Sequence, residues 1–357
     1  MVKIAANQST MIGSMPQKSA PEACALLERY PLAIPTWPQL PKRSFKEAMI
    51  PQYTEGFPGV RVDDHDKRIW VEMDEELPNA LAHFYEQVLA ENFEAFAISA
   101  EYAAGFHYVR QQFERANAKV PLLKGQVTGP FTFGLGLNDN ERKAVWFDEQ
   151  YRDVVLKGLA LKAVWQIREL QKYAQEVVLF FDEPIFSALG TPAYMGIQDE
   201  DVLAVLNEVI QAAQRAGALV GVHCCGNMDW GLLARTAVDI ISFDAYFYGD
   251  KVALYPDAIN AFLQRGGLLA FGIVPTGNAE KLREETPAGL QRKLAELIRL
   301  FAQKGIAEAH IRSQMILTPS CGMGSGSLSI EESQHVLELL AGLTHHPPQS
   351  SRERGEA

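Results

Sequence analysis

Short runs of apolar, often β-branched residues recur along this chain and alternate with longer amphipathic stretches. Each short run is continuously apolar, which is typical of a strand buried on both faces of a parallel sheet. An eighth strand fits at Gln8–Ser14, just before Pro16. The other seven runs predict strands at Phe96–Ser99, Leu122–Val127, Val177–Phe181, Leu219–His223, Ile240–Phe243, Leu268–Ile273 and Met315–Thr318.

The amphipathic stretches between these runs predict helices. We expect them over Asp148–Glu176, Asp199–Ala216 and Pro287–Lys304, and the last two end just before a glycine. Strands that alternate with helices imply a parallel sheet with crossover connections. Eight such units predict an α/β fold, a single (β/α)8 TIM barrel with its active site at the C-terminal ends of the strands. A doubly wound sheet is the alternative.

The barrel is expected to form one catalytic domain over residues 1–344. Residues 345–357 are polar and contain proline, a composition that predicts a disordered tail. Residues 31–60 hold six prolines and little periodicity. They therefore predict an elaborated loop that covers the barrel.

Charge and cysteine content narrow the class of protein. The 33 basic and 44 acidic residues give a net charge of −11, which argues against nucleic acid as a partner. Four dispersed cysteines are not a disulfide framework. We find no signal peptide and no apolar run long enough to enter a membrane. A cytoplasmic enzyme with reduced thiols is the expectation.

Polar side chains of the kinds that carry chemistry follow the expected strands. The C-terminal strand ends of a barrel converge on one mouth, so residues far apart in sequence are expected to meet there. These residues are Ser14, Glu101, Thr128, Asp182, Glu183, His223, Cys225, Asp244 and Cys321.

One imidazole and two thiols form the most specific of these groups. His223 and Cys225 are one residue apart, so both point to the same side of a strand end. Cys321 would join them from the last strand. This is a donor set that zinc prefers, and three protein ligands leave a fourth position open for a substrate. The alternative for any single cysteine is an inert core residue, which is our expectation for Cys24 and Cys224.

Two further features suggest a binding site beside the metal. Asp182 and Glu183 end a buried strand, where a carboxylate is costly unless it binds something. The alternative is a helix cap or a turn, which the following Pro184 suits. Gly13 permits close backbone approach, so the N–H groups around Ser14 could hold a carboxylate.

Six stretches occur in a specific order, at Ile12–Gln17, Lys124–Pro130, Phe181–Pro184, His223–Cys225, Ile241–Asp244 and Pro319–Gly322. In that order and spacing they resemble the catalytic domain of cobalamin-independent methionine synthase, in the uroporphyrinogen decarboxylase-like barrel superfamily. The short, core-only members of the family are the most similar. The matches run from the first expected strand to the last.

The resemblance implies a zinc ion held by His223, Cys225 and Cys321. In the family a glutamate completes the resting site, and here Asp244 takes its place. Aspartate is one methylene shorter than glutamate, so ligation by Asp244 needs a closer approach.

The resemblance also implies a homocysteine site. The substrate carboxylate would be held by the turn formed by Ile12, Gly13 and Ser14. Its amino group would be held by Asp182 and by a glutamate from an early strand, for which Glu101 is the candidate.

The implied reaction is methyl transfer to a thiol, with homocysteine as acceptor and methionine as product. The donor is either a methyl-corrinoid such as methylcobalamin, delivered by a corrinoid protein, or methyltetrahydrofolate. Cys225-Gly226-Asn227 is similar to corrinoid-dependent methyltransferases, including those that act on coenzyme M. The charge of Asp182 favours homocysteine over coenzyme M, which has no amine.

Two other functions stay open. A metal-free decarboxylase of the uroporphyrinogen type would hold propionate groups with cationic residues, for which Arg43 and Arg61 are available. A non-catalytic zinc-bearing or corrinoid-handling subunit would bind the metal and transfer nothing by itself.

Overall fold

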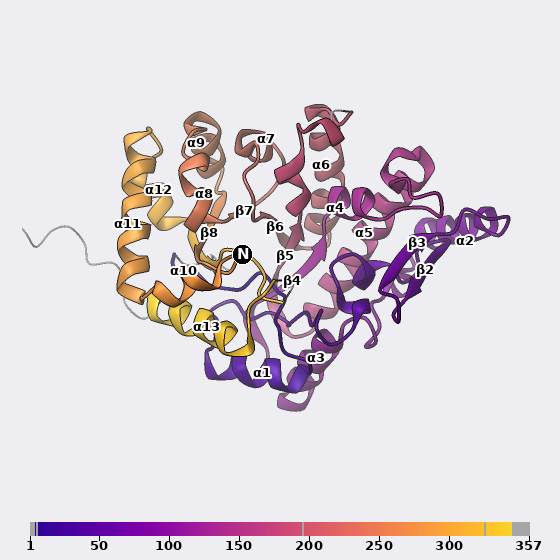
Figure 1. The fold of residues 1–357 in the computed structure, drawn as a ribbon, viewed down its shortest axis with the longest axis horizontal. Coiled ribbons are helices and arrows are strands. Elements are labelled where there is room, and N and C mark those ends of the chain that lie inside the picture. The colour runs from indigo at the N-terminus through magenta and orange to yellow at the C-terminus, as the bar shows by residue number, and fades with distance from the viewer. Residues whose placement is uncertain (1–3, 5, 195, 325, 345–357) are drawn as a thin grey trace, which may run out of the picture.

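The computed structural model describes residues 4–344, with gaps at residues 5, 195 and 325 (Figure 1). Its centre is a curled sheet of seven parallel strands, and helices surround this sheet. This is an α/β fold compatible with a TIM-like barrel. The strands, in their order across the sheet, are β1 (Gln8–Ser9), β9 (Met315–Pro319), β8 (Leu268–Val274), β7 (Ile240–Phe243), β6 (Ala218–Cys224), β5 (Ala174–Asp182) and β4 (Val120–Thr128).

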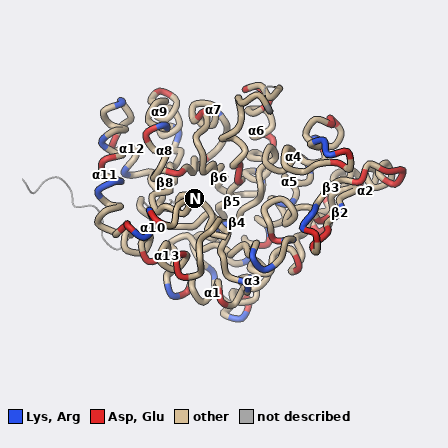
Figure 2. Tube along the Cα trace, in the orientation of Figure 1, with Lys and Arg blue, Asp and Glu red and all other residues tan. Residues whose placement is uncertain are grey.

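The helices pack along the outside of the sheet, and acidic and basic residues mix along them (Figure 2). An antiparallel hairpin, β2 (Val60–Asp63) with β3 (Arg68–Val71), lies at one end of the molecule beside α2 (Figure 1). None of the described helices is long and apolar enough to cross a membrane. The α-helices are α1 (Ala20–Arg29), α2 (Leu77–Leu89), α3 (Ala104–Ala116), α4 (Pro130–Gly136), α5 (Glu149–Leu170), α6 (Asp199–Arg215), α7 (Trp230–Ala234), α8 (Ala245–Val252), α9 (Pro256–Gln264), α10 (Ala279–Glu284), α11 (Pro287–Gln303), α12 (Glu308–Ser313) and α13 (Ile330–Thr344).

Much of the predicted element order is confirmed. Six of the seven apolar runs lie inside β4 to β9, whereas the expected strand at Gln8–Ser14 is regular only over β1. The helices predicted at Asp199–Ala216 and Pro287–Lys304 are α6 and α11. The long helix predicted at Asp148–Glu176 ends earlier, because the chain turns after Leu170 and β5 begins at Ala174. The predicted disordered tail, residues 345–357, lies outside the described residues.

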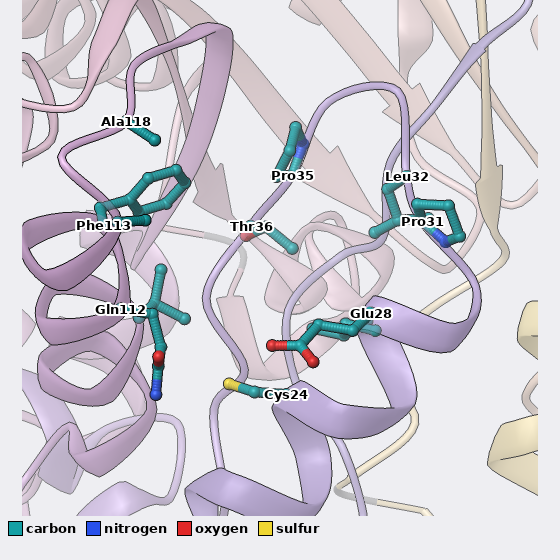
Figure 3. Close-up of a pocket in the computed structure, with 12 residues that line it drawn as sticks. Cys24, Glu28, Pro31, Leu32, Pro35, Thr36, Gln112, Phe113 and Ala118 are labelled. Carbon is teal, nitrogen blue, oxygen red and sulfur yellow. The ribbon is translucent and has the colours of Figure 1, made fainter.

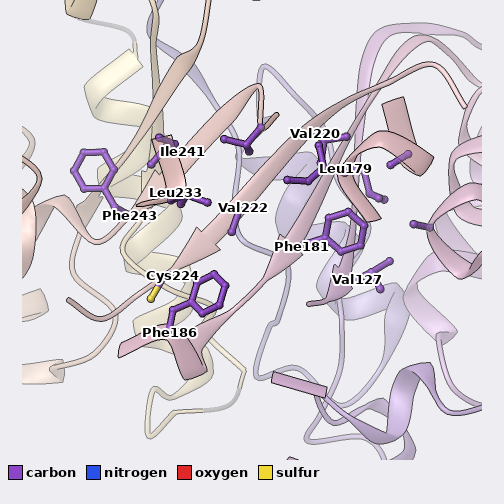
Figure 4. Packing of buried hydrophobic residues seen from close by; sticks show 14 of the residues in the cluster. Val127, Leu179, Phe181, Phe186, Val220, Val222, Cys224, Leu233, Ile241 and Phe243 are labelled. Atoms are coloured by element: carbon purple, nitrogen blue, oxygen red, sulfur yellow. The ribbon is translucent and has the colours of Figure 1, made fainter. Parts of the chain in front are cut away.

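The strands are buried on both faces, as their continuous apolar runs require. A small cluster on the inner face of the curled sheet contains Leu122, Phe180 and Ile240. The alternate residues, such as Phe181 and Val222, pack outward in a larger cluster with the helices (Figure 4). Strand alternation therefore assigns every residue of the sheet to the inner or the outer face.

The strand predicted at Phe96–Ser99 is wrong. A 3₁₀ helix occupies Phe93–Phe96, and residues 97–99 belong to no strand. Side chains form hydrogen bonds with the backbone carbonyl oxygens that a neighbouring strand would otherwise bind. Lys162 Nζ donates to the carbonyl oxygens of Phe96 and Ala97, and the His107 ring binds the carbonyl of Ile98 at 2.7 Å.

Residues 34–39 instead lie between the two edge strands, β1 and β4. Ile34 N–H donates to Ser9 at 2.9 Å, and Lys124 N–H donates to Pro35 at 2.7 Å. Isolated parallel bridges join Thr36 to Lys124 and Ser14 to Gln39. The segment contains two prolines, which lack an N–H group and so prevent a regular ladder. The two prolines are therefore the reason why the sequence does not predict a strand here.

Candidate metal centre and substrate site

Strand alternation brings the candidate polar residues onto the inner face. Asp182 is two residues beyond Phe180, and Ser242 is two beyond Ile240, so both share the face of the inner apolar cluster. The register pairs Asp182 with His223, and His223 with Ser242, on adjacent strands. Three strand ends thus present a continuous row of polar groups to the inside of the sheet.

His223, Cys225 and Cys321 form one cluster. One ligand atom from each residue lies within 4.8 Å of the other two. Ligand atoms around a tetrahedral zinc are roughly 3.5–3.8 Å apart, because Zn–S bonds are about 2.3 Å and Zn–N bonds about 2.0–2.1 Å. Small side-chain movements would therefore suffice to bind a metal ion.

The imidazole of His223 is oriented by Ser242. Its Nδ1 lies 3.0 Å from Ser242 Oγ, and both side chains are buried. Its Nε2 is also buried but has no hydrogen-bond partner among the described residues. A buried ring nitrogen without a partner costs free energy unless something binds it. The donor set and this orphaned nitrogen together fit a zinc ion.

The two sulfurs of the cluster behave as a pair. The Cys321 thiol and the His223 ring lower the pKa of Cys225 to about 4. The same contact, together with burial, raises the pKa of Cys321. A lowered cysteine pKa beside an imidazole suits metal binding, because a cysteine ligand must be deprotonated. Cys224 points to the outer face and packs in the core (Figure 4).

Asp182 carries the second orphaned atom. Its side chain is buried, and Oδ1 has no hydrogen-bond partner in the described part of the chain. Burial raises the pKa of Asp182 to about 6, while His223 and Lys124 pull it down. An unpartnered carboxylate oxygen in this position points to a cationic ligand such as an ammonium group.

The neighbouring acid has a structural role. Glu183 faces outward and accepts hydrogen bonds from the Phe131 N–H at 2.9 Å and the Thr132 N–H at 2.7 Å. These N–H groups belong to the first turn of α4, so Glu183 caps that helix. The helix-cap alternative therefore holds for Glu183 and not for Asp182.

The turn of Ile12, Gly13 and Ser14 lies against the loop that carries Cys321. The Ser14 carbonyl accepts from Met323 N–H at 2.9 Å, and Ser14 Oγ accepts from Gly324 N–H at 3.1 Å. In the described chain, the N–H groups of Gly13 and Ser14 donate to no protein acceptor. Two free N–H groups in one turn suit an anion such as a carboxylate.

Two of the predicted site residues have other partners. Glu101 does not stand at a strand end, because a 3₁₀ helix precedes it where a strand was predicted. Its side chain is 64% exposed and paired with Lys46. Asp244 caps α8 by accepting from Phe247 N–H at 2.9 Å. Burial raises the pKa of Asp244 to about 7. It lies outside the group of three described residues whose ligand atoms share 4.8 Å.

Several inner-face polar residues were missed at the sequence level. Lys124 and Gln126 alternate with Leu122 on β4, and both are fully buried. The hydroxyl of Tyr53 donates to the Gln126 carbonyl at 2.8 Å and accepts from the Gln39 amide at 3.0 Å. Period-2 spacing within the Lys124–Pro130 stretch is the signal that marks these two β4 residues as inward-facing.

A separate cavity of about 300 Å³ lies between α1 and α3 (Figure 3). Its walls are mainly apolar and include Cys24, Phe113 and Pro35. No residue of the metal cluster or of the Ile12 turn lines it. Burial raises the pKa of Cys24 to about 12, so this cysteine stays a protonated, unreactive thiol.

No protein-family model and no curated protein sequence matches this chain. Among solved structures, a Xaa-Pro dipeptidase with bound methionine aligns with a TM-score of 0.32 at 12% identity, over 76% of this chain and 67% of that one. That score is too low to carry an argument. The chain is more similar to a B12-independent methionine synthase from Shewanella sp. W3-18-1, in complex with selenomethionine. The TM-score is 0.59 at 12% identity, over 96% of this chain and 97% of that one, so the two share a fold over nearly their whole length.

Proposed function

We propose that this protein is a zinc-dependent methyltransferase that moves a methyl group to a thiol, with homocysteine as acceptor and methionine as product. The observation that carries the proposal is the inner-face row of orphaned groups. His223, whose Nε2 has no partner, clusters with the Cys225 and Cys321 sulfurs, and Asp182 with its unpartnered Oδ1 is paired with His223 on the adjacent strand. The fold shared with a methionine synthase supports the same reading.

His223 Nε2 and the sulfurs of Cys225 and Cys321 would hold the zinc ion. A zinc ion bound there supplies Lewis acidity, which keeps the sulfur of an incoming thiol deprotonated near neutral pH. Asp244 is the proposed fourth, exchangeable ligand, because it directly follows β7 and its charge interacts with both Cys225 and His223.

The chain's own residues would bind the rest of homocysteine. Asp182 pairs with the ammonium group, and the free N–H groups of Gly13 and Ser14 take the carboxylate, with Ile12 completing the turn. Glu101 would have to leave Lys46 before it could reach the amine, so Asp182 is assigned first. These contacts aim the side-chain sulfur at the metal cluster, since the turn packs directly on the Cys321 loop.

In the transfer step, the substrate sulfur donates an electron pair to the methyl carbon while the bond from carbon to its leaving group breaks. The leaving group keeps that bond's electron pair. N5 of methyltetrahydrofolate would also take up a proton, which balances the one that the thiol gives up, whereas the cobalt of a methyl-corrinoid would take the electron pair alone and the thiol proton would pass to solvent. The similar synthase is described as B12-independent, which supports the folate donor. The Cys225-Gly226-Asn227 stretch supports the corrinoid donor, with a corrinoid protein as partner.

The metal-free decarboxylase is less well supported. Arg43 pairs with the buried Glu47, and Arg61 lies on the β2 strand of the hairpin, 3.9 Å from Asp74. Both cations therefore already have carboxylate partners, whereas the His–Cys–Cys cluster would have no use in that reaction.

We also infer that residues 34–39 take the eighth place of a closed (β/α)8 barrel, which would make the barrel a single catalytic domain.

The test begins with zinc measured in the purified protein. Homocysteine and coenzyme M are then each assayed with methylcobalamin and with methyltetrahydrofolate. We expect bound zinc and methionine formation from homocysteine with one of the two donors. Full turnover by a zinc-free Cys225→Ser/Cys321→Ser double variant would overturn the proposal, and bound zinc without transfer to either thiol would favour the non-catalytic subunit.

A further inference from the structure

Lys124 is a fully buried amine on the inner face of β4. Its Nζ donates to the carbonyl oxygen of Ile12 at 2.6 Å and to Gln126 Oε1 at 3.1 Å. It also lies 4.6 Å from the centre of the Phe180 ring. Lysine is rarely buried completely unless its charge has a specific use. The His–Cys–Cys cluster gives it no such use, since none of these contacts is with His223, Cys225 or Cys321.

The contact with Ile12 fixes the orientation of a peptide group. In a planar trans peptide the C=O and the following N–H point in opposite directions. Because the Ile12 carbonyl points at Lys124, the Gly13 N–H points away from it. That N–H is one of the two in the turn that lack a protein acceptor. Flipping this peptide would remove the anion-binding geometry and leave Lys124 without its closest acceptor.

Lys124 also acts on Asp182 through charge. Burial lowers the pKa of Lys124 to about 8, and the charge of Asp182 opposes that shift. No hydrogen bond joins the two side chains in the described structure, and Asp182 Oδ1 stays unpartnered. Lys124 therefore faces this carboxylate without occupying the oxygen that a substrate ammonium would bind.

We propose that Lys124 is a positioning residue that makes the site selective for thiols carrying an α-amino acid group. It holds the Ile12–Gly13 peptide by its hydrogen bond to the Ile12 carbonyl, so that the turn receives the carboxylate of that group. The inference rests on the proposed function, because it concerns how the acceptor of that reaction is recognised.

The chain offers a matched control. Lys162 on α5 is also completely buried and also donates to backbone carbonyls, those of Phe96 and Ala97. It has no contact with the Ile12 turn, Asp182 or the cluster among the interactions described. Replacing either lysine by methionine removes a buried charge with little change of length, but only Lys124→Met should alter acceptor recognition.

The experiment compares homocysteine with two truncated thiols. 4-Mercaptobutyrate lacks the amine, and 3-aminopropane-1-thiol lacks the carboxylate. For Lys124→Met we expect the KM for homocysteine to rise by about 10- to 100-fold, the range set by losing one hydrogen bond to a charged group. The kcat and bound zinc should change little, and the KM values of the truncated thiols should change less than that of homocysteine. Lys162→Met should keep the wild-type order of KM values.

A second variant and a binding measurement keep the test decisive. Lys124→Gln retains a donor for the Ile12 carbonyl, so the KM for homocysteine should rise less than in Lys124→Met. Methionine binding, measured by calorimetry without turnover, should weaken in both Lys124 variants. Unchanged KM ratios and unchanged methionine binding in either folded variant would overturn the inference. A wild-type protein that transfers no methyl group, yet binds methionine in a Lys124-dependent way, would overturn the proposed function alone.

Discussion

Replacing Ser242 by alanine should weaken zinc binding without touching a ligand. For Nε2 of His223 to bind a metal, the ring proton must sit on Nδ1. There it donates to Ser242 Oγ, which is 3.0 Å away on the adjacent strand. Both residues are buried, so water has little access to replace the lost hydroxyl. Without that acceptor, the proton can move to Nε2 and block the metal.

The expected size of the effect follows from this geometry. Removing the group that orients a ligating histidine typically costs about 10- to 100-fold in metal affinity. At about 1.4 kcal/mol for each factor of ten, this corresponds to ~1.4–2.8 kcal/mol. The upper half of the range is expected for Ser242→Ala, because the ring nitrogen would be left buried and unpaired.

The assay is competition for zinc between the protein and a chromogenic chelator. Thr318→Val is the control, because Thr318 Oγ1 is a buried hydroxyl at the end of β9 with no partner among the described residues. Ser242→Thr restores the hydroxyl and should recover most of the affinity. If Ser242→Ala binds zinc as tightly as the wild type, or if Thr318→Val weakens it equally, the argument for an oriented imidazole is refuted.

Three further outcomes are expected. Cys225→Ser and Cys321→Ser should each lose zinc on dialysis and lose turnover, because a serine hydroxyl is not ionised at neutral pH. Elemental analysis measures the zinc, and zinc retained in either variant would contradict the ligand assignment. Gly322→Ala should lower zinc affinity and turnover together, since a Cβ there would lie 2.2 Å from Ser14 Oγ and push the Cys321 loop away from the turn; unchanged kinetics would show that the loop adjusts freely. Burial lowers the pKa of Lys162 to about 7 in the folded protein, so the unfolded chain binds the extra proton between about pH 7 and 10. The free energy of unfolding should therefore rise with pH over that range. Its slope should exceed the slope of Lys162→Met by at most about 1.4 kcal/mol per pH unit, and equal slopes in denaturant titrations of the two proteins would exclude a lowered pKa for Lys162.

The strands of the metal side were predictable because a parallel strand buried on both faces leaves a short, continuous apolar run. The runs before His223 and Cys321 are of this kind, and the cluster residues stand at or just beyond their ends. Period-2 alternation then fixes which side chains face inward. The His–Cys–Cys cluster could be assembled from sequence because it needs only strand order and alternation.

The adjacent acids Asp182 and Glu183 show where sequence reasoning stops. Alternation sends one of them inward and the other outward, but it does not say what each will meet. Glu183 accepts hydrogen bonds from the first turn of α4, which follows the neighbouring strand β4. The Oδ1 atom of Asp182 has no hydrogen-bond partner among the described residues. The distinction between a helix cap and a binding group is set by tertiary contacts.

The segment that could not be predicted borders the proposed amino-acid site. Residues 34–39 lack a regular ladder because of their prolines, and side-chain hydrogen bonds hold them instead. Thr36 Oγ1 donates to the Lys124 carbonyl at 3.0 Å, and Gln126 Nε2 donates to the Trp37 carbonyl at 3.2 Å. If residues 34–39 formed a regular strand, its backbone would pair directly with β4, and the side chains of Lys124 and Gln126 would not be needed to hold it. Polar groups on that side of the sheet therefore serve both to anchor an irregular segment and to shape the turn at Ile12. An amino-acid head group is accordingly expected beside the Ile12 turn and Asp182, with its sulfur directed toward the His–Cys–Cys cluster.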